Sequence, residues 1–296
     1  MNRIHLMPFT YFEAESLDEV SQLLLQYGNR AQIMAGGIDL IPRIRTGSVV
    51  ADRIIGIQNL KELQYFRFAS DKGLEFGAMT TLHELELSKV MQEVYPELQR
   101  AIHQITSTQT RCMGTAVGNI ALATPATDVG PAMMAYDAEL LIYGPEGQRR
   151  EKVSDFYVDY RKSSLRPGEF ITGIFIPTPA PGTGARFINR NRTHGDIAKI
   201  SVTCLMTVEN GVCRKARIGL GSVAPIALRA KEAENVLEGQ SVTDELLVRA
   251  SEVMQENLHP ISDIRSTAEY RLDVTRVLVE RALFSAFERA TGGEAK

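Results

Sequence analysis

The chain has 296 residues, of which 44% are hydrophobic and 23% are charged, and its formal net charge is -3. These values are typical of a globular protein with two or three structural units, and the lack of a basic excess argues against nucleic-acid binding. No apolar run approaches the roughly 20 residues that span a bilayer, and the N-terminus lacks the apolar core of a secretory signal. We therefore expect a cytoplasmic protein without membrane insertion.

The sequence contains no obvious metal-binding pattern. Its three cysteines, Cys112, Cys204 and Cys213, are scattered, and its five histidines are equally dispersed. An iron–sulfur cluster held by four thiolates therefore cannot form within this chain alone. The sequence predicts no metal site here.

A β-α-β pattern opens the chain. Ser16 is expected to cap a helix, because Glu19 follows it at the capping-box spacing and apolar residues then recur at helical intervals. A short strand over 31–35 runs directly into the pair Gly36-Gly37. A second strand over 53–57 closes this first unit.

The middle of the chain mixes strands and helices. Its predicted elements are a hairpin over 65–78, helices from 82 and over 96–105, and strands over 138–143 and 170–177. The stretch from 114 to 131 is rich in Gly, Ala, Thr and Asn, and no periodicity is visible there. We expect that stretch to be irregular.

Pro and Gly are dense from Pro177 to Gly184, which predicts a linker. The elements expected beyond it are strands over 200–208 and 216–220, and helices over about 228–237, 243–256 and 264–291. This last portion is α+β. The predicted division of the chain is therefore residues 1–59, 60–178 and 185–291.

Two glycine-containing loops are the candidate binding elements. The first is Ile33-Met34-Ala35-Gly36-Gly37-Ile38-Asp39, where a strand ends in paired glycines. Bare backbone N–H groups at such a turn form a concave site for an anion such as a pyrophosphate. The pattern is not G-x-G-x-x-G, so a Rossmann site is unsupported. A plain tight turn is the other reading of this loop.

The second loop runs from Gln109 to Asn119 and is followed by Thr124-Pro125-Ala126-Thr127-Asp128. Its small residues admit a ligand close to the backbone, and Thr115, Asn119 and Thr127 offer hydrogen bonds to phosphate or ribose oxygens. Asp128 suits a ribose hydroxyl or a flavin edge. A small-residue loop that only packs remains the alternative. Together the two loops can clamp one diphosphate from both sides.

The two loops resemble those of the FAD-binding (medium) subunits of the molybdenum hydroxylases, the xanthine dehydrogenase and carbon monoxide dehydrogenase family. The family's A-G-G-T-D-L, Q-I-R-N-V-G-T-I-G-G-N and S-P-x-x-D correspond to residues 35–40, 109–119 and 124–128. Three later motifs follow in the family's order: L-x-P-G-E-x-I from Leu165, R-x-x-x-D-x-A from Arg192 and S-A-E-Y-R from Ser266. The resemblance covers residues from about 8 to about 285.

Two positions differ from the family pattern. Ile38 replaces a Thr or Ser, which removes a hydroxyl beside the expected diphosphate. Val117 replaces the first Gly of T-I-G-G-N, and a β-branched residue tolerates positive φ poorly. The turn therefore either uses an ordinary φ at Val117 or has a shifted geometry.

The resemblance implies an α+β fold with a two-subdomain FAD-binding domain, of the vanillyl-alcohol-oxidase-like or CO dehydrogenase flavoprotein type. An α+β C-terminal domain of the CO dehydrogenase flavoprotein type would follow. The implied FAD-binding residues are Ile33, Met34, Ala35, Gly36, Gly37, Ile38, Asp39, Thr115, Gly118, Asn119, Thr127, Asp128, Ile171 and Ile197. The loops would hold the diphosphate, with Thr127 and Asp128 at the ribityl or diphosphate region. Ile171 and Ile197 would lie near the isoalloxazine ring unless they are ordinary packing residues. No catalytic residue is predicted on this chain.

The function implied by the resemblance is electron transfer within a larger oxidoreductase. A large partner subunit would carry molybdopterin with molybdenum or tungsten, and a small partner would carry two [2Fe–2S] clusters. Electrons would reach FAD on this chain and leave to an external acceptor such as NAD, in a dimer of heterotrimers. Two alternatives stay open: a standalone FAD-dependent oxidoreductase, and a scaffold subunit without flavin.

Overall fold

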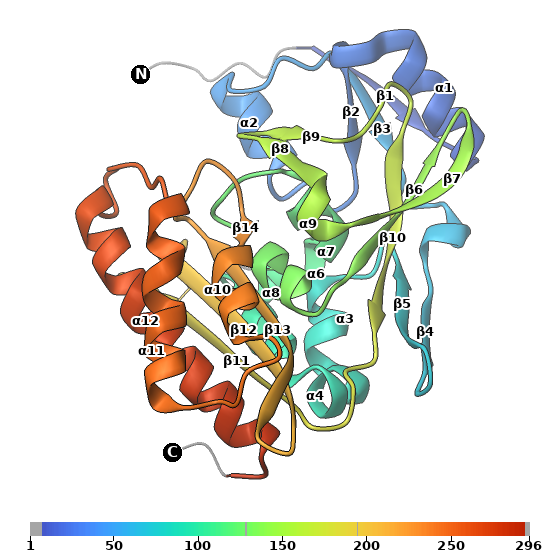
Figure 1. Cartoon of the computed structure of the whole chain (residues 1–296). Coiled ribbons are helices and arrows are strands. Elements are labelled where there is room, and N and C mark those ends of the chain that lie inside the picture. The colour runs from blue at the N-terminus through green and yellow to red at the C-terminus, as the bar shows by residue number, and fades with distance from the viewer. Residues whose placement is uncertain (1–7, 128, 194, 294–296) are drawn as a thin grey trace.

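The computed structural model describes residues 8–127, 129–193 and 195–293. The chain forms three units, each with its own sheet, and helices accompany every sheet (Figure 1). We call them the N-terminal, middle and C-terminal units. The predicted α+β fold class is confirmed.

The N-terminal unit is a three-stranded parallel sheet in the order β1-β3-β2 with two helices. Its elements are β1 (Thr10–Glu13), α1 (Leu17–Tyr27), β2 (Ala31–Met34), α2 (Leu40–Thr46) and β3 (Arg53–Gly56). Ser16 caps α1 as predicted, and its hydroxyl oxygen accepts a hydrogen bond from the Glu19 N–H at 3.2 Å. Parallel strands end at one sheet edge, so the residues after β2 and β3 lie side by side.

The middle unit is built on a five-stranded antiparallel sheet in the order β4-β5-β10-β6-β7. These strands are β4 (Phe66–Ala69), β5 (Gly73–Gly77), β6 (Glu139–Gly144), β7 (Gly147–Lys152) and β10 (Phe170–Pro177). A small hairpin is formed by β8 (Tyr157–Asp159) and β9 (Lys162–Ser163). The helices are α3 (Leu82–Leu87), α4 (Lys89–Val94), α5 (Pro96–His103), α6 (Thr108–Met113), α7 (Ala116–Ala121), α8 (Val129–Ala135) and α9 (Val153–Phe156).

The expectation of an irregular stretch over 114–131 was wrong, because this stretch contains α7 and the beginning of α8. Each helix is less than two full turns long, which is too short to show a periodic pattern. All seven residues of α8 are buried. A helix that is surrounded by protein needs no polar face, and its sequence therefore has no amphipathic signal.

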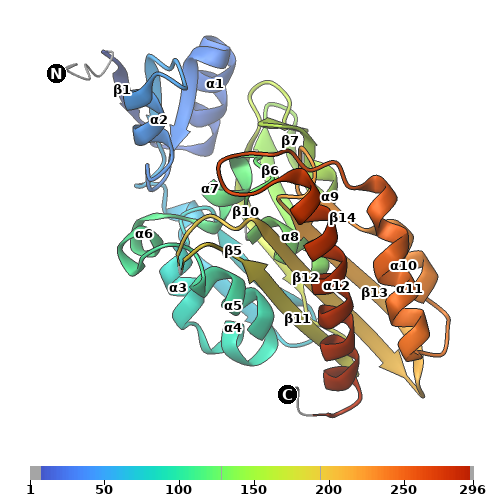
Figure 2. The ribbon, with the colours of Figure 1, turned by 90° about the vertical axis from the view of Figure 1, so that its left-hand side faces the viewer.

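The C-terminal unit is a four-stranded antiparallel sheet in the order β11-β12-β13-β14. Its elements are β11 (Thr183–Arg190), β12 (Ile200–Glu209), β13 (Val212–Gly221), β14 (Leu228–Arg229), α10 (Lys231–Leu237), α11 (Asp244–Val253) and α12 (Ala268–Ala290). Helices α10 and α12 pack on one face of this sheet, and α11 packs against both of them (Figures 1 and 2). Helix α8 of the middle unit packs on the other face. The chain passes from β10 to β11 between 177 and 183, within the predicted linker, and the limits of the three predicted domains stay a prediction.

Charged and backbone groups tie the C-terminal unit to the middle unit. The Asp137 carboxylate, between α8 and β6, accepts bonds from Lys215 at 2.5 Å, Arg217 at 3.0 Å and Arg229 at 3.2 Å. The backbone N–H of Ser222 also donates to the Pro125 carbonyl at 2.7 Å. Among the described residues, no helix is long and apolar enough to cross a membrane.

We predict that Asp137→Asn lowers stability by about 3 kcal/mol, because three cations lose their shared carboxylate. Burial alone would raise the pKa of Asp137, but Lys215, Arg217 and Arg229 outweigh it and lower that pKa. The stabilising effect should therefore be complete above the unfolded Asp pKa of about 3.9 and disappear as pH falls through the lower folded pKa. The melting temperatures of the wild type and of Asp137→Asn, measured at intervals of about one pH unit from about pH 2 to about pH 7, should therefore converge in acid. A constant difference across that range would contradict the assignment.

Candidate functional site

The two glycine loops are in direct contact. A Cβ placed on Gly36 would lie 1.7 Å from the Met113 carbonyl oxygen, so only glycine allows this approach. Gly37 has φ +70°, a left-handed conformation that side chains other than glycine rarely adopt. The paired glycines thus serve two separate needs, close contact at the first position and chain reversal at the second.

The first loop presents backbone donors that the protein itself leaves unused. Within the described part of the chain, the N–H groups of Gly36, Gly37 and Ile38 donate no hydrogen bond. The Ile38 side chain is exposed, so its change from the family's hydroxyl residue leaves the backbone donor accessible. Three successive free N–H groups form the kind of concave site that binds an anion.

Gln58 supports the first loop from the neighbouring strand. It follows β3, and its side-chain Nε2 donates to the Ala35 carbonyl at 3.1 Å. The Tyr11 hydroxyl donates to Gln58 Oε1, also at 3.1 Å. Sequence reasoning missed Gln58. Its signal was its position just beyond a strand parallel to β2, at the sheet edge where the loop begins.

A groove of about 510 Å³ runs between the two loops. Its lining residues are Met34, Ala35, Gly36, Gly37, Ile38, Ile41, Pro42, Gln58, Met79, Thr81, Cys112 and Met113. The walls are mainly apolar, and the polar groups come from the loop backbone, Gln58 and Thr81. Such a composition suits a planar or aromatic group attached to an anion.

A second groove of about 500 Å³ adjoins the first, since Met79 and Thr81 line both. Tyr65 and Glu84 belong to its lining. Burial and the neighbouring Glu75 raise the pKa of Tyr65 to about 12, so its hydroxyl stays protonated at neutral pH. This hydroxyl is therefore a hydrogen-bond donor rather than an anion.

Thr115 shapes the second loop as a helix cap. Its hydroxyl oxygen accepts from the Gly118 N–H at 3.0 Å at the start of α7. Val117 lies inside α7 and is absent from the described non-glycine residues with positive φ. The turn therefore uses an ordinary φ at this position, which is the first of the two possibilities considered above. Valine is compatible with the loop for that reason.

Asn119 and Thr127 are brought together behind this cap. The Thr127 hydroxyl donates to Asn119 Oδ1 and accepts from the Gly130 N–H at 3.2 Å. These bonds fix the Asn119 side chain, while its Nδ2 group has no partner among the described residues. An oriented amide donor therefore remains available to a ligand.

The other predicted residues are placed less directly. Asp39 precedes α2 and its carboxylate pairs with Arg43 at 3.1 Å. Ile171, on β10, is buried in the core of the middle unit, whereas Ile197 is 43% exposed in the loop between β11 and β12. Neither lines the groove between the loops, and their contact with the isoalloxazine ring stays a prediction. Asp128 lies outside the described residues.

Two family descriptions match nearly the whole chain. Residues 7–179 match the FAD binding domain in molybdopterin dehydrogenase, and residues 186–286 match the CO dehydrogenase flavoprotein C-terminal domain. The chain belongs to this FAD-binding family. The resemblance read from the loops is thereby confirmed, and so is FAD as the cofactor of this chain.

Several known proteins are similar to this chain in sequence and in structure. The alpha subunit of the 6-hydroxypseudooxynicotine dehydrogenase complex from Paenarthrobacter nicotinovorans is 32% identical, and the match covers 95% of each chain. The carbon monoxide dehydrogenase medium chain of Afipia carboxidovorans is also 32% identical, over 95% of this chain and 98% of that one. Carbon monoxide dehydrogenase from Hydrogenophaga pseudoflava has a solved chain with a TM-score of 0.92 and 31% identity, covering 96% and 99% of the two chains. These relatives are oxidoreductase proteins, and so is this subunit.

The described residues fit FAD on physical grounds as well. The free N–H groups of the first loop match a diphosphate. Asn119 lines neither groove, so a bond from its amide to the diphosphate stays a prediction. Apolar walls beside these donors match an aromatic ring. No acidic side chain has to face the negatively charged diphosphate in this arrangement.

We predict that Gly36→Ala strongly reduces FAD binding. The added methyl would overlap the Met113 carbonyl, so the two loops must separate. Separation by about 1 Å removes donors from one side of the diphosphate, and FAD affinity should fall by on the order of 100-fold. Flavin absorbance per protein in the purified chain measures this.

Gly47→Ala is the matched control, because Gly47 ends α2 with φ +71° and a Cβ there would meet nothing within 4 Å. It should lower the melting temperature through backbone strain while FAD content stays at the wild-type level. Equal FAD content in Gly36→Ala and wild type would show that the loop contact is irrelevant to the cofactor.

Proposed function

We propose that this chain is the electron-transfer subunit of a molybdenum- or tungsten-containing hydroxylase. In this proposal it accepts electrons from [2Fe–2S] clusters on a small partner subunit and passes them through FAD to an external acceptor such as NAD. Substrate oxidation takes place on a large partner that carries molybdopterin. Bound FAD supplies the redox chemistry, since it takes up electrons singly and releases them in pairs.

The contact between the two glycine loops is the observation that carries the proposal. It brings free backbone donors of the N-terminal unit next to the second loop of the middle unit, which supports a site in which both units hold the same ligand. The whole-chain match to FAD-binding family members supports this assignment of the groove.

Within the site, this chain's own residues bind and orient. Gly36, Gly37 and Ile38 donate from the backbone to the diphosphate, and Asn119 donates from its side chain. Thr127 keeps the Asn119 amide in place. The apolar walls of the groove contact the bound cofactor. No residue of this chain needs to exchange a proton with the substrate of the complex.

The names of the relatives support the proposed partners. Several of them are named as a medium chain or as a subunit of a dehydrogenase. We extend this to the present chain as a complex with one large and one small subunit, paired as a dimer of heterotrimers. Among the described residues, no group of three or more His, Cys, Asp or Glu is arranged to hold a metal ion. A cytoplasmic location also remains a prediction of the sequence.

The purified complex tests this proposal. We expect FAD, molybdenum or tungsten, and two [2Fe–2S] clusters per copy of this chain, with flavin absorbance near roughly 450 nm that bleaches when substrate is added without air. The isolated chain should bind FAD but turn over no substrate. Turnover by the isolated chain would instead indicate a standalone oxidoreductase, and a colourless complex would indicate a scaffold subunit. Release of FMN in place of FAD would also contradict the proposal.

Asn119→Leu should reduce FAD occupancy, because it removes an oriented donor and adds an apolar group beside the diphosphate. Loss of a hydrogen bond to a charged group costs on the order of 2 kcal/mol, or about 30-fold in affinity. FAD titration followed by flavin fluorescence measures the change. Asn235→Leu is a suitable control, since Asn235 is exposed on α10 in the C-terminal unit. Wild-type affinity in Asn119→Leu would remove Asn119 from the site.

A further inference from the structure

A buried ion pair joins the second glycine loop, through its residue Arg111, to helix α3. Glu86 of α3 receives both Nε of Arg111 at 2.7 Å and Nη2 of Arg111 at 3.2 Å, in a two-pronged arrangement. The two side chains are only 9% and 6% exposed. A buried pair of this kind restricts both side chains to one geometry.

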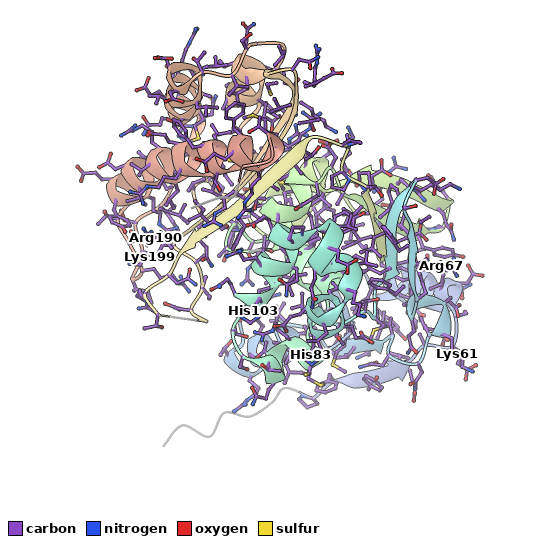
Figure 3. The ribbon with its side chains drawn as sticks, turned by 90° about the horizontal axis from the view of Figure 1, so that it is seen from below. Lys61, Arg67, His83, His103, Arg190 and Lys199 are labelled. Atoms are coloured by element: carbon purple, nitrogen blue, oxygen red, sulfur yellow. The ribbon has the colours of Figure 1, made fainter. Side chains whose placement is uncertain are left out.

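Two histidines complete the coordination of the Glu86 carboxylate. His103 Nδ1 lies 2.6 Å from Oε1, and His83 Nδ1 lies 3.3 Å from Oε2. Burial alone would raise the pKa of Glu86, but the bonds from His103, Arg111 and His83 lower it, so the group is ionised at neutral pH. Figure 3 shows both histidines on the lower face of the molecule, on neighbouring parts of the middle unit.

Arg111 directs its remaining donors at the turn before α6 and at Thr108, the first residue of α6. Its Nη1 donates to the carbonyls of Ile105 at 2.7 Å and Thr106 at 3.3 Å, and its Nη2 donates to the Thr108 hydroxyl at 3.2 Å. Thr106 has φ +36°, which is unusual for a residue with a β-branched side chain. Such a conformation persists only where the surroundings fix it, and Arg111 supplies these bonds.

The turn and the helix that Arg111 holds make contacts on both sides. A Cβ on Gly195, in the loop between β11 and β12, would lie 3.2 Å from the Thr106 carbonyl oxygen, so the C-terminal unit rests on this turn. Two residues beyond Arg111, the Met113 carbonyl meets Gly36 of the first loop. Arg111 therefore stands between the contact with the C-terminal unit and the contact between the glycine loops.

We propose that Arg111 is a positioning residue for the flavin: Glu86 orients its guanidinium, which sets the second glycine loop and the Thr106 turn at their correct distance from the cofactor. This inference rests on the proposed function, because it takes the glycine loops as the FAD site. Arg111 lines neither of the two grooves. Its effect on FAD is transmitted through the backbone of α6 and the turn.

Arg111→Lys tests this in the full chain. A lysine ammonium cannot make the two-pronged bond to Glu86 and the three bonds to the turn together. We expect FAD affinity, from a fluorescence titration, to fall about tenfold. The visible circular dichroism of the bound flavin should also change, because the protein groups around the cofactor are then displaced. A residue that only stabilised the fold would lower the melting temperature without changing this spectrum.

Arg229→Lys is the matched control. Arg229 is 10% exposed and makes a two-pronged pair with Glu234, which is 5% exposed. It also donates to Asp137 at the interface with the middle unit, but it lies in the C-terminal unit and lines neither groove. It should lose thermal stability much as Arg111→Lys does, with unchanged FAD affinity and flavin spectrum. Wild-type affinity and spectrum in Arg111→Lys would overturn the proposal.

Glu86→Gln provides a second variant should Arg111→Lys fail to fold. The glutamine amide keeps the size of the carboxylate but replaces one acceptor oxygen by an N–H donor, so Arg111 loses one bond of the two-pronged pair and its ionic partner. Its FAD affinity should fall several-fold with the same spectral change. If neither variant folds while Arg229→Lys does, the pair serves folding and the proposal is overturned. A wild-type chain that binds no FAD would instead refute the proposed function itself.

Discussion

The site depends on one close approach, the contact of Gly36 with the carbonyl of Met113. Two units that share no sheet meet at this point, and neither loop alone surrounds a ligand. The approach requires a residue without a Cβ on one side and a defined helix end on the other. Gln58 supports the first loop at Ala35, next to Gly36, and Thr115 caps α7 two residues beyond Met113.

The C-terminal unit is joined to the same arrangement at two levels. Asp137 and Pro125 attach its sheet to the middle unit, and the loop around Gly195 rests on the Thr106 turn. A displacement of that turn would therefore be felt both at the unit interface and, through α6, at the glycine loops. The three units therefore meet around the contact between the glycine loops as well as along the sheet interface.

Much of the fold was visible in local sequence signals. The cap at Ser16, the apolar spacing of α1 and the hairpin of β4 and β5 were predicted because each depends on neighbours in the chain. Strand β7 was not predicted, because its residues, Gly147–Lys152, are largely charged and do not suggest a strand. It is stabilised by its backbone pairing with β6, which local composition does not reveal. Helix α8 was missed because a fully buried helix has no periodic polar face.

The candidate site divides in the same way. The glycine loops could be found because the family motifs are contiguous in sequence, and the structure adds that they touch. The bond from Gln58 and the pair of Glu86 with Arg111 could not be found, because each joins residues more than 20 positions apart. Val117 shows the opposite case. A sequence comparison marks it as a departure at a glycine position, yet the backbone there is helical, so the fold accepts valine without strain. The loop requires a particular backbone conformation at this position rather than a particular residue. A valine within α7 adopts that conformation.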